Sequence, residues 1–254
     1  MKNLVTVSVL VFTFLFSHAQ NVKYGGWNEQ IVVGATASLN STWIFNSAIQ
    51  SLDEGISDQK FSFGYNVGGS FEYRFNELIA VGLDLQYFSL SQEYDGAIST
   101  QSQFWESSVK LNGLNIPIYA KIMTKGGAFV EIGWQFGIIL GSNFDRTSTA
   151  GGSIESNKDV SEHFSTAIFS PHLGFGFDFP VNDAVMITAG IRANYGINDV
   201  KGVDGLGNPI EDYPNTSSGN PPLSPADTQP APSNVLTAGI FLGVRYAFDA
   251  GGRY

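Results

Sequence analysis

The sequence predicts an all-β fold: an eight-stranded antiparallel transmembrane β-barrel of the outer membrane, with short periplasmic turns and long extracellular loops. Three observations support this prediction. Apolar and polar residues alternate over long stretches, short and long connections alternate between these stretches, and no helix-length apolar run follows the first 20 residues. A period of two places successive side chains on opposite faces of a strand. A strand that crosses a bilayer obliquely needs about 9–11 residues.

The composition limits the classes of partner. The chain has 254 residues, enough for one β domain of ordinary size, with a formal net charge of −10 and no cysteine. Nucleic acid is disfavoured as a partner because it requires basic patches. A chain without cysteine cannot be acylated on cysteine as a lipoprotein, and no disulfide contributes to its stability.

The N-terminal segment predicts the compartment. Lys2 supplies a positive start, residues 4–16 are apolar, and Ser17-His18-Ala19 places small residues at the two positions that a signal peptidase reads. The alternative, a retained membrane anchor, is disfavoured because the apolar run is too short to span a bilayer comfortably. We therefore expect residues 1–19 to be a secretory signal peptide and residues 20–254 to form one outer-membrane β-barrel domain.

The alternation is clearest in the stretch 61–76, FSFGYNVGGSFEYRFN. Its odd-numbered positions are apolar or aromatic except for Gly69, and its even-numbered positions are polar or glycine. The predicted strands cover residues 31–39, 61–76, 79–87, 104–123, 130–140, 167–179, 185–197 and 236–248.

The connections between these strands predict their orientation. Three connections, near Asn76, Lys125 and Asn182, are short. The other four, which alternate with them, are long and polar. Outer-membrane barrels show this asymmetry, with short turns in the periplasm and longer loops outside. The sequence therefore places both chain ends in the periplasm.

One strand, residues 104–123, shows a slip in its alternation. Trp105, Val109 and Leu111 share one parity, whereas the apolar residues from Leu114 onward share the opposite parity. A β-bulge shifts parity by one residue. We therefore expect a bulge at Asn112-Gly113.

Alternation alone does not tell whether the apolar face meets lipid or an internal core, and a secreted lipocalin-like barrel is the alternative. Across the seven best-defined strands the apolar face carries no Lys, Arg, Asp or Glu, as expected where a midplane charge costs about 2–4 kcal/mol. The opposite face is rich in glycine, which suits the narrow interior of an eight-stranded barrel. Both features favour a lipid-facing apolar surface.

The charges on the predicted inward face balance, with five acidic and five basic residues besides one histidine. Unpaired buried charges are costly, so we expect these residues to pair and to plug the lumen. The predicted lumen charge network comprises Glu72, Arg74, Asp84, Glu106, Lys110, Lys121, Glu131, His172, Asp178, Arg192 and Arg245.

Aromatic residues near the ends of the apolar faces predict girdles at the two headgroup levels. The predicted aromatic girdle comprises Phe61, Phe63, Phe71, Tyr73, Phe75, Tyr87, Trp105, Phe177, Phe179, Tyr195, Tyr246 and Phe248.

Two segments resemble a known family. LNIPIYAK, from Leu114 to Lys121, and YGINDV, from Tyr195 to Val200, are similar to strand and loop-entry sequences of PorT-family outer-membrane β-barrel proteins of Bacteroidota, which are small OmpA/OmpX-like barrels. The resemblance implies an accessory role in a secretion system for the founding member, but no motif here carries that role over. It also implies that barrel assembly machinery reads a terminal aromatic, here Phe248 or Tyr254.

Catalytic and metal-binding candidates are few. His172 could act as a general base near Asp178 or Glu131, but a hydrogen-bonded lumen residue is the favoured interpretation. No G-x-S-x-G nucleophile motif is present. An acidic loop could hold calcium, although its spacing matches no defined calcium loop and a solvated loop is favoured. The acidic loop residues are Asp199, Asp204, Glu211 and Asp212.

We therefore expect a non-enzymatic barrel with a plugged lumen, without cofactor or metal, that acts through its extracellular loops or as an accessory to a secretion or envelope machine. The expected partners are outer-membrane lipid or lipopolysaccharide, the barrel assembly machinery and an envelope protein. The alternatives are a small-solute channel and, less favoured, a barrel enzyme or a lipocalin-like secreted binder. The expected location is the outer membrane of a Gram-negative bacterium.

Overall fold

The computed structural model describes residues 29–46, 58–98, 103–148, 153–210 and 232–249. The predicted signal segment and Glu211, Asp212 and Tyr254 lie outside these ranges. No helix in the described part of the chain is long and apolar enough to span a membrane. The elements are β1 (Gln30–Asn46), β2 (Asp58–Lys60), β3 (Ser62–Arg74), β4 (Ile79–Ile98), β5 (Gln103–Met123), β6 (Ala128–Ser148), β7 (Ser153–Asp159), the 3₁₀ helix η1 (Ser161–His163), β8 (Ala167–Pro180), β9 (Val185–Tyr195) and β10 (Ser233–Asp249).

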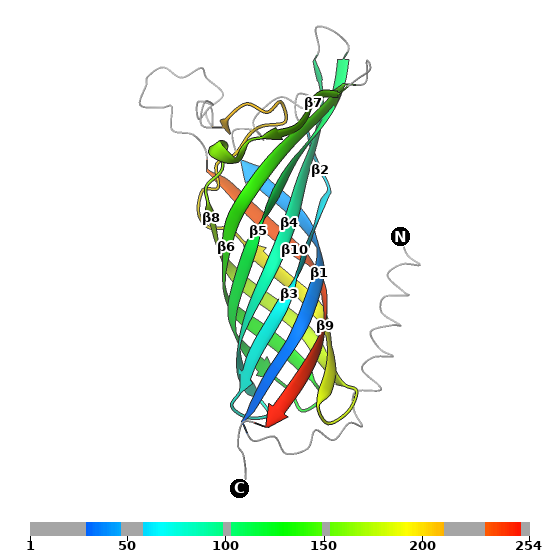
Figure 1. The fold of residues 1–254 in the computed structure, drawn as a ribbon, viewed down its shortest axis with the longest axis vertical. Coiled ribbons are helices and arrows are strands. Elements are labelled where there is room, and N and C mark those ends of the chain that lie inside the picture. The colour runs from blue at the N-terminus through cyan, green and yellow to red at the C-terminus, as the bar shows by residue number, and fades with distance from the viewer. Residues whose placement is uncertain (1–28, 47–57, 99–102, 149–152, 211–231, 250–254) are drawn as a thin grey trace.

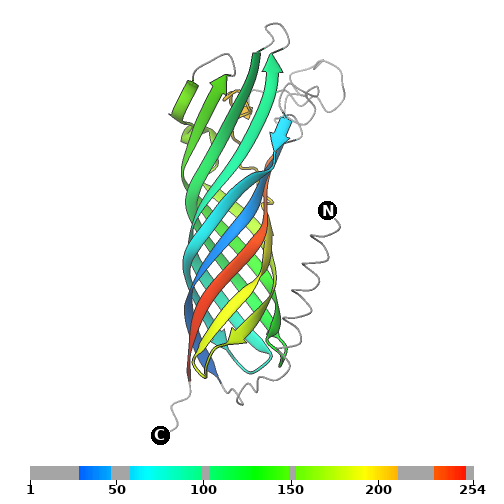
Figure 2. The ribbon, with the colours of Figure 1, turned by 90° about the vertical axis from the view of Figure 1, so that its right-hand side faces the viewer.

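Eight of these strands close into an antiparallel barrel, as the sequence predicts (Figures 1 and 2). The first strand of the ring, β1, pairs with both β3 and the last strand, β10. The ring continues from β3 through β4, β5, β6, β8 and β9 to β10. The two short strands lie outside the ring order, β2 against β4 and β7 against β6. Both stand at the end of the barrel that carries the long connections, which we call the loop end (Figure 1).

The opposite end of the barrel, which we call the turn end, carries three short connections. Asparagine side chains stabilise two of them. Asn76 Oδ1 accepts hydrogen bonds from the backbone N–H groups of Leu78 and Ile79 at 2.8 and 2.9 Å. Asn182 Oδ1 accepts the equivalent pair from Ala184 and Val185. Such Asx turns favour a tight reversal of the chain. The predicted short turns therefore have a local cause.

The outward face of the barrel carries an apolar band. On β4, β5 and β6, residues paired across the strands form rows, and the outward rows are apolar from the turn end upward. The first row consists of Ile79, Ile122 and Val130. The last consists of Tyr87, Leu114 and Ile138. Large side chains such as Ile122 remain 56% exposed, which fits a surface that meets hydrocarbon.

Beyond that last row, β4, β5 and β6 continue towards the loop end for about ten more residues each. On β4 and β6 the sequence pattern placed polar loops there, because the strand prediction for β4 stopped at Tyr87 and that for β6 stopped at Leu140. The predicted strand 104–123 already covers most of the cap part of β5. The added lengths still alternate, but their apolar residues, such as Phe88, Leu90 and Phe144, point inward and are at most 4% exposed. Apart from Phe104 and Leu140, which are 60% and 65% exposed, the side chains that point outward there are mostly polar, and polar residues were interpreted as loop.

The pairing is irregular at Asn112-Gly113, where the sequence predicts a bulge, but the extra residue lies on β6 and not on β5. Side chains of β5 alternate without interruption, and Trp105, Val109 and Leu111 are buried inside the barrel. The β5–β6 ladder does shift register beside Asn112, but Leu140 on β6 is the residue skipped by the pairing. The slip in the hydrophobic pattern of β5 therefore records a change in surroundings, not an extra residue.

The barrel interior has two parts. Near the loop end lies one apolar cluster, the external core, which comprises Ile44, Phe88, Leu90, Tyr94, Trp105, Val109, Leu111, Ile139, Phe144, Val160, Phe164, Ile168, Val200, Val203 and Val235. We call the cap the residues 88–98, 103–113 and 139–148 together with β2, β7, η1 and the segment 198–210. The body is the remainder of the barrel, enclosed by the apolar band; at their loop ends its strands β1, β8 and β10 contribute Ile44, Ile168 and Val235 to the external core. Below that core its interior is mainly polar, with two small apolar clusters, Ala80 with Met123, Phe129 and Phe241, and Val32 with Met186 and Ala247.

Candidate functional site

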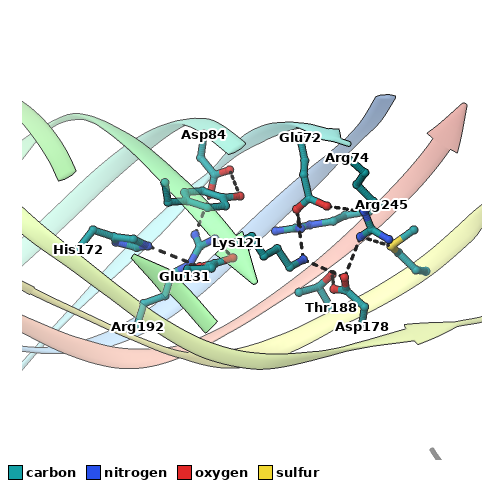
Figure 3. A network of polar contacts seen from close by, with 12 residues as sticks. Glu72, Arg74, Asp84, Lys121, Glu131, His172, Asp178, Thr188, Arg192 and Arg245 are labelled. Atoms are coloured by element: carbon teal, nitrogen blue, oxygen red, sulfur yellow. Dashed lines mark hydrogen bonds and ion pairs between the residues drawn. The ribbon is translucent and has the colours of Figure 1, made fainter. Parts of the chain in front are cut away.

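The interior of the body holds a network of buried charged side chains (Figure 3). They come from seven of the eight barrel strands, and each is at most 7% exposed. They point inward because each alternates with outward neighbours, as Glu72 does between Phe71 and Tyr73. The eight charged members are Glu72, Arg74, Asp84, Lys121, Glu131, Asp178, Arg192 and Arg245.

Five of these charges form a cluster nearer the turn end. Lys121 Nζ donates to Asp178 Oδ2 at 2.8 Å and to Glu72 Oε2 at 3.2 Å. Arg74 contacts the same two carboxylates, and its Nη2 lies 2.8 Å from Asp178 Oδ2. Arg245 Nη1 donates to Glu72 Oε2 at 2.7 Å. Each carboxylate in this cluster therefore contacts at least two cations.

The remaining three charges form a second cluster around Arg192. Its Nε and Nη2 donate to the two oxygens of Glu131 at 2.8 and 3.2 Å, and its Nη1 donates to Asp84 Oδ2 at 2.7 Å. Tyr119 completes the shell of Asp84 by donating its hydroxyl proton to Oδ1 at 3.1 Å. Bidentate arginine–carboxylate pairs are among the strongest polar contacts in proteins.

His172 lies against this second cluster. Its Nδ1 is 2.7 Å from Asn194 Oδ1, its Nε2 is 3.5 Å from Glu131 Oε2, and its ring packs beside that of Tyr119. The side chain is completely buried. Both ring nitrogens face protein groups, which favours the lumen interpretation over a general base.

The structure places two predicted members of the network elsewhere. Glu106 and Lys110 point outward from the cap, with side chains 65% and 51% exposed. Glu106 pairs with Lys60 at 2.8 Å, and Lys110 pairs with Asp145 at 3.1 Å. The assumed bulge caused the error, because it assigned the wrong face to every residue before Asn112. The buried charges of the body therefore balance four against four.

Trp105 is wrongly assigned to the aromatic girdle for the same reason, and it is buried in the external core. The other eleven girdle residues point outward, eight of them 40–56% exposed and the other three partly buried. Neighbouring rings contact each other at both ends of the band, as in the pairs Tyr246–Phe248 at 4.6 Å and Phe61–Phe63 at 4.8 Å. This arrangement matches the two girdles of a membrane barrel.

The acidic loop uses its described aspartates to shape the backbone. Asp199 Oδ1 accepts the N–H groups of Lys201 and Ser233, and Asp204 Oδ1 accepts those of Leu206 and Asn208. In the part of the chain that the structure describes, no group of three or more His, Cys, Asp or Glu residues could hold a metal ion.

Sequence reasoning missed the closure of the cap by the segment 198–210. Val200 and Val203 from this segment are buried in the external core. Its backbone is held by the cap strands, since Ser107 Oγ donates to the Gly205 carbonyl at 2.7 Å and Arg146 Nη1 donates to the Leu206 carbonyl at 3.0 Å. The available signal was the spacing of apolar residues at 200, 203, 206 and 210 within a loop interpreted only through its acidic residues.

Comparisons with known proteins agree with this architecture. Residues 18–202 match the model of a family described as "Outer membrane protein beta-barrel domain". No curated protein matches the chain. The protein is therefore located in the outer membrane of a Gram-negative bacterium.

Several solved structures of outer-membrane proteins are similar in fold. OprG from Pseudomonas aeruginosa is 12% identical with a TM-score of 0.46, and the match covers 91% of this chain and 100% of OprG. Neisserial surface protein A is 15% identical with a TM-score of 0.34, covering 88% of this chain and 99% of that one. The outer membrane protease OmpT from Escherichia coli is 8% identical with a TM-score of 0.35, covering 91% and 100%.

Proposed function

The chain belongs to the family of outer membrane protein beta-barrel domains, and from this premise we propose that it is a non-conducting, non-enzymatic interaction barrel. In this proposal the body anchors the protein in the membrane, and the cap presents a folded surface outside the cell. The partner is an outer-membrane component or an envelope machine that the cap or the barrel wall contacts.

One observation supports the proposal: buried side chains pack against each other inside both parts of the barrel. The body contains the two ion-pair clusters, and the cap contains the external core closed by the segment 198–210. At the turn end, a cavity of about 30 Å³ beside Arg74 and Asp178 offers room for about one water molecule. A solute would have to break several buried ion pairs and then unfold an apolar core.

The order of the cap also supports a role in interaction. Membrane anchoring alone needs no hydrophobic core outside the apolar band, yet the cap buries aromatic side chains such as Phe144 and Trp105 in the external core. A rigid surface loses less conformational entropy on binding than a flexible loop does.

The segments that resemble PorT-family proteins support a finer form of the proposal. They lie on β5 and at the exit of β9, within the residues matched by the broader family. In this form the protein is an accessory of a secretion or envelope machine in Bacteroidota, exported by its N-terminal signal peptide.

Conductance in a planar bilayer tests the proposal against the channel alternative. The refolded protein should insert without producing current steps, whereas a general porin in the same bilayer should produce them. Heat-dependent migration on a denaturing gel verifies that the silent sample is folded. Reproducible current steps from the folded protein would overturn the proposal and favour a small-solute channel.

A further inference from the structure

The outer wall of the cap is a sheet face that no described element covers. Above the last apolar row, the outward rows of β4 and β5 become polar. They pair Ser89 with Asn112, Ser91 with Lys110, Glu93 with Ser108, and Asp95 with Glu106. Rows on one face of a strand lie about 7 Å apart, so this polar face continues directly from the surface that meets lipid.

A cleft of about 250 Å³ lies on this face. Its volume is just below the range of about 300–1,000 Å³ that is usual for drug-sized ligands, so it suits a group the size of a single ring. The side chains of the cleft offer carboxylates, hydroxyls and one ammonium. They include Lys60, Glu93, Glu106, Ser108, Asp145 and Thr147.

Exposed aromatic residues place the cleft at the level of the lipid headgroups. Lys60 immediately precedes Phe61, which is 56% exposed and whose ring contacts those of Trp43 and Phe63. Exposed aromatic rings on membrane proteins gather at the headgroup level. The molecules that surround a barrel wall at this level on the external side of a Gram-negative outer membrane are lipopolysaccharides.

The chemistry of the cleft fits the sugars of this lipid. Carboxylate and hydroxyl oxygens accept hydrogen bonds from sugar hydroxyls, and Glu93 and Ser108 are paired across the strands. Lys60 and Lys110 stand beside these acceptors and contact Glu106 and Asp145. Their ammonium groups can also pair with the phosphate groups next to the sugars.

We propose that this cleft binds an inner-core sugar of lipopolysaccharide, with Glu93, Ser108 and Asp145 as hydrogen-bond acceptors and the two lysines facing the adjacent phosphates. The inference rests on the proposed function and names one partner of the interaction barrel. It assigns recognition to the membrane-level wall of the cap rather than to the tips of its loops.

The test compares two probes: deep-rough lipopolysaccharide, which carries inner-core sugars, and the lipid A prepared from it by mild acid. Affinities are measured for the folded protein in phosphatidylcholine nanodiscs. The wild type should bind the sugar-bearing lipid about tenfold more tightly than lipid A, which corresponds to about 1.4 kcal/mol. Equal affinities would overturn the inference.

Ser108→Phe fills the cleft from an outward strand position, where an aromatic side chain is well accommodated. This variant should bind both probes equally. Ser89→Phe is the matched control, because it makes the same change on the same face outside the cleft, opposite Asn112, and it should keep the tenfold preference. Glu93→Ala removes an acceptor without filling the cleft and should reduce the preference severalfold.

Heat-dependent gel migration confirms that each variant is folded before it is compared. Loss of the preference in Ser89→Phe as well as in Ser108→Phe would overturn the inference, as would an unchanged preference in both Ser108→Phe and Glu93→Ala. The outcomes are separate from those of the conductance test. If the barrel conducts but keeps the preference for sugar-bearing lipid, only the proposed function is contradicted. If the barrel does not conduct and shows no such preference, only the inference about the cleft is contradicted.

Discussion

The body and the cap are built from the same strands with opposite polarity. In the body, β5 points Ile118 and Ile122 outward and Lys121 inward; in the cap, the same strand points Glu106 and Lys110 outward and Trp105 inward. The backbone pattern of β5 does not change between the two parts. The difference teaches that alternation reports the solvent that each face meets, and that this solvent changes along one strand.

The physical cause is the boundary between hydrocarbon and water. Apolar side chains lose nothing by facing lipid, so the body leaves its polar groups inside, where they must pair with each other. Above the membrane the outer face meets water, and burial of apolar surface again favours an apolar interior. The lipocalin-like alternative, apolar inside and polar outside, is thus wrong for the body but describes the cap.

The largest difference in stability between the cap and the body is expected from Phe144→Ala. Phe144 is fully buried in the external core, and truncating a buried phenylalanine costs about 3–5 kcal/mol. The cap should open while the body stays folded. Limited proteolysis should cut the cap strands, while heat-dependent gel migration of the membrane-embedded fragment persists. Complete loss of the folded band would show that the two parts do not separate.

A comparable effect within the body is expected from Arg192→Leu. This change leaves Glu131 and Asp84 without their main cation, and breaking a buried ion pair from one side costs about 3–5 kcal/mol. Urea unfolding in detergent micelles measures the loss. Adding Glu131→Gln should restore part of it, because one of the two uncompensated charges is removed. If the stability losses of the two single substitutions simply added in the double variant, the coupling between Arg192 and Glu131 would be contradicted.

The same substitution on one face of β4 should have different effects in the two parts. Leu83→Arg places a charge in the apolar band and should cost about 2–4 kcal/mol of folding stability. Ser91→Arg lies on the same face in the cap and should change stability by less than about 0.5 kcal/mol. Urea unfolding in lipid vesicles measures both variants. Equal losses would mean that the apolar band continues past Tyr87.

The smallest effect is expected from pH at Asp159, in the cap. Asp159 Oδ1 accepts hydrogen bonds from the hydroxyl and the backbone N–H of Ser161, which lower the pKa of this carboxyl below its ordinary value. A depressed folded-state pKa stabilises the native state above the unfolded pKa of about 3.9, and the contribution is lost as pH falls through the folded value. Amide exchange at Ser161 should therefore accelerate, beyond its intrinsic pH dependence, only below about pH 4. In Asp159→Asn this additional step should disappear.

Much of the body could be predicted from the sequence, because in each of its strands apolar residues that face lipid alternate with residues that face the interior. The network residues Glu72, Glu131 and Arg192 share a parity opposite to aliphatic and aromatic neighbours, and this parity is enough to place them inside. Their particular partners could not be predicted, since pairing depends on how neighbouring strands are staggered around the ring.

The cap was harder to predict because two physical causes produce the same pattern. A bulge and a change of solvent both reverse the parity of apolar residues, and residues 104–112 alone do not distinguish them. The neighbouring strand does: Phe88, Leu90 and Tyr94 reverse parity at the same level on β4. A single bulge cannot reverse two adjacent strands together, whereas a membrane boundary must.

The most direct test of this inversion follows nitroxide labels along β5. The chain has no cysteine, so Ile118→Cys, Leu111→Cys and Lys110→Cys each provide a single attachment site. Collisions with oxygen report contact with lipid, and collisions with a water-soluble nickel chelate report contact with water. The inversion predicts oxygen access at 118, chelate access at 110 and little access to either at 111. Oxygen access at 111 together with protection at 110 would show that the lipid face continues through a bulge, and would contradict the account.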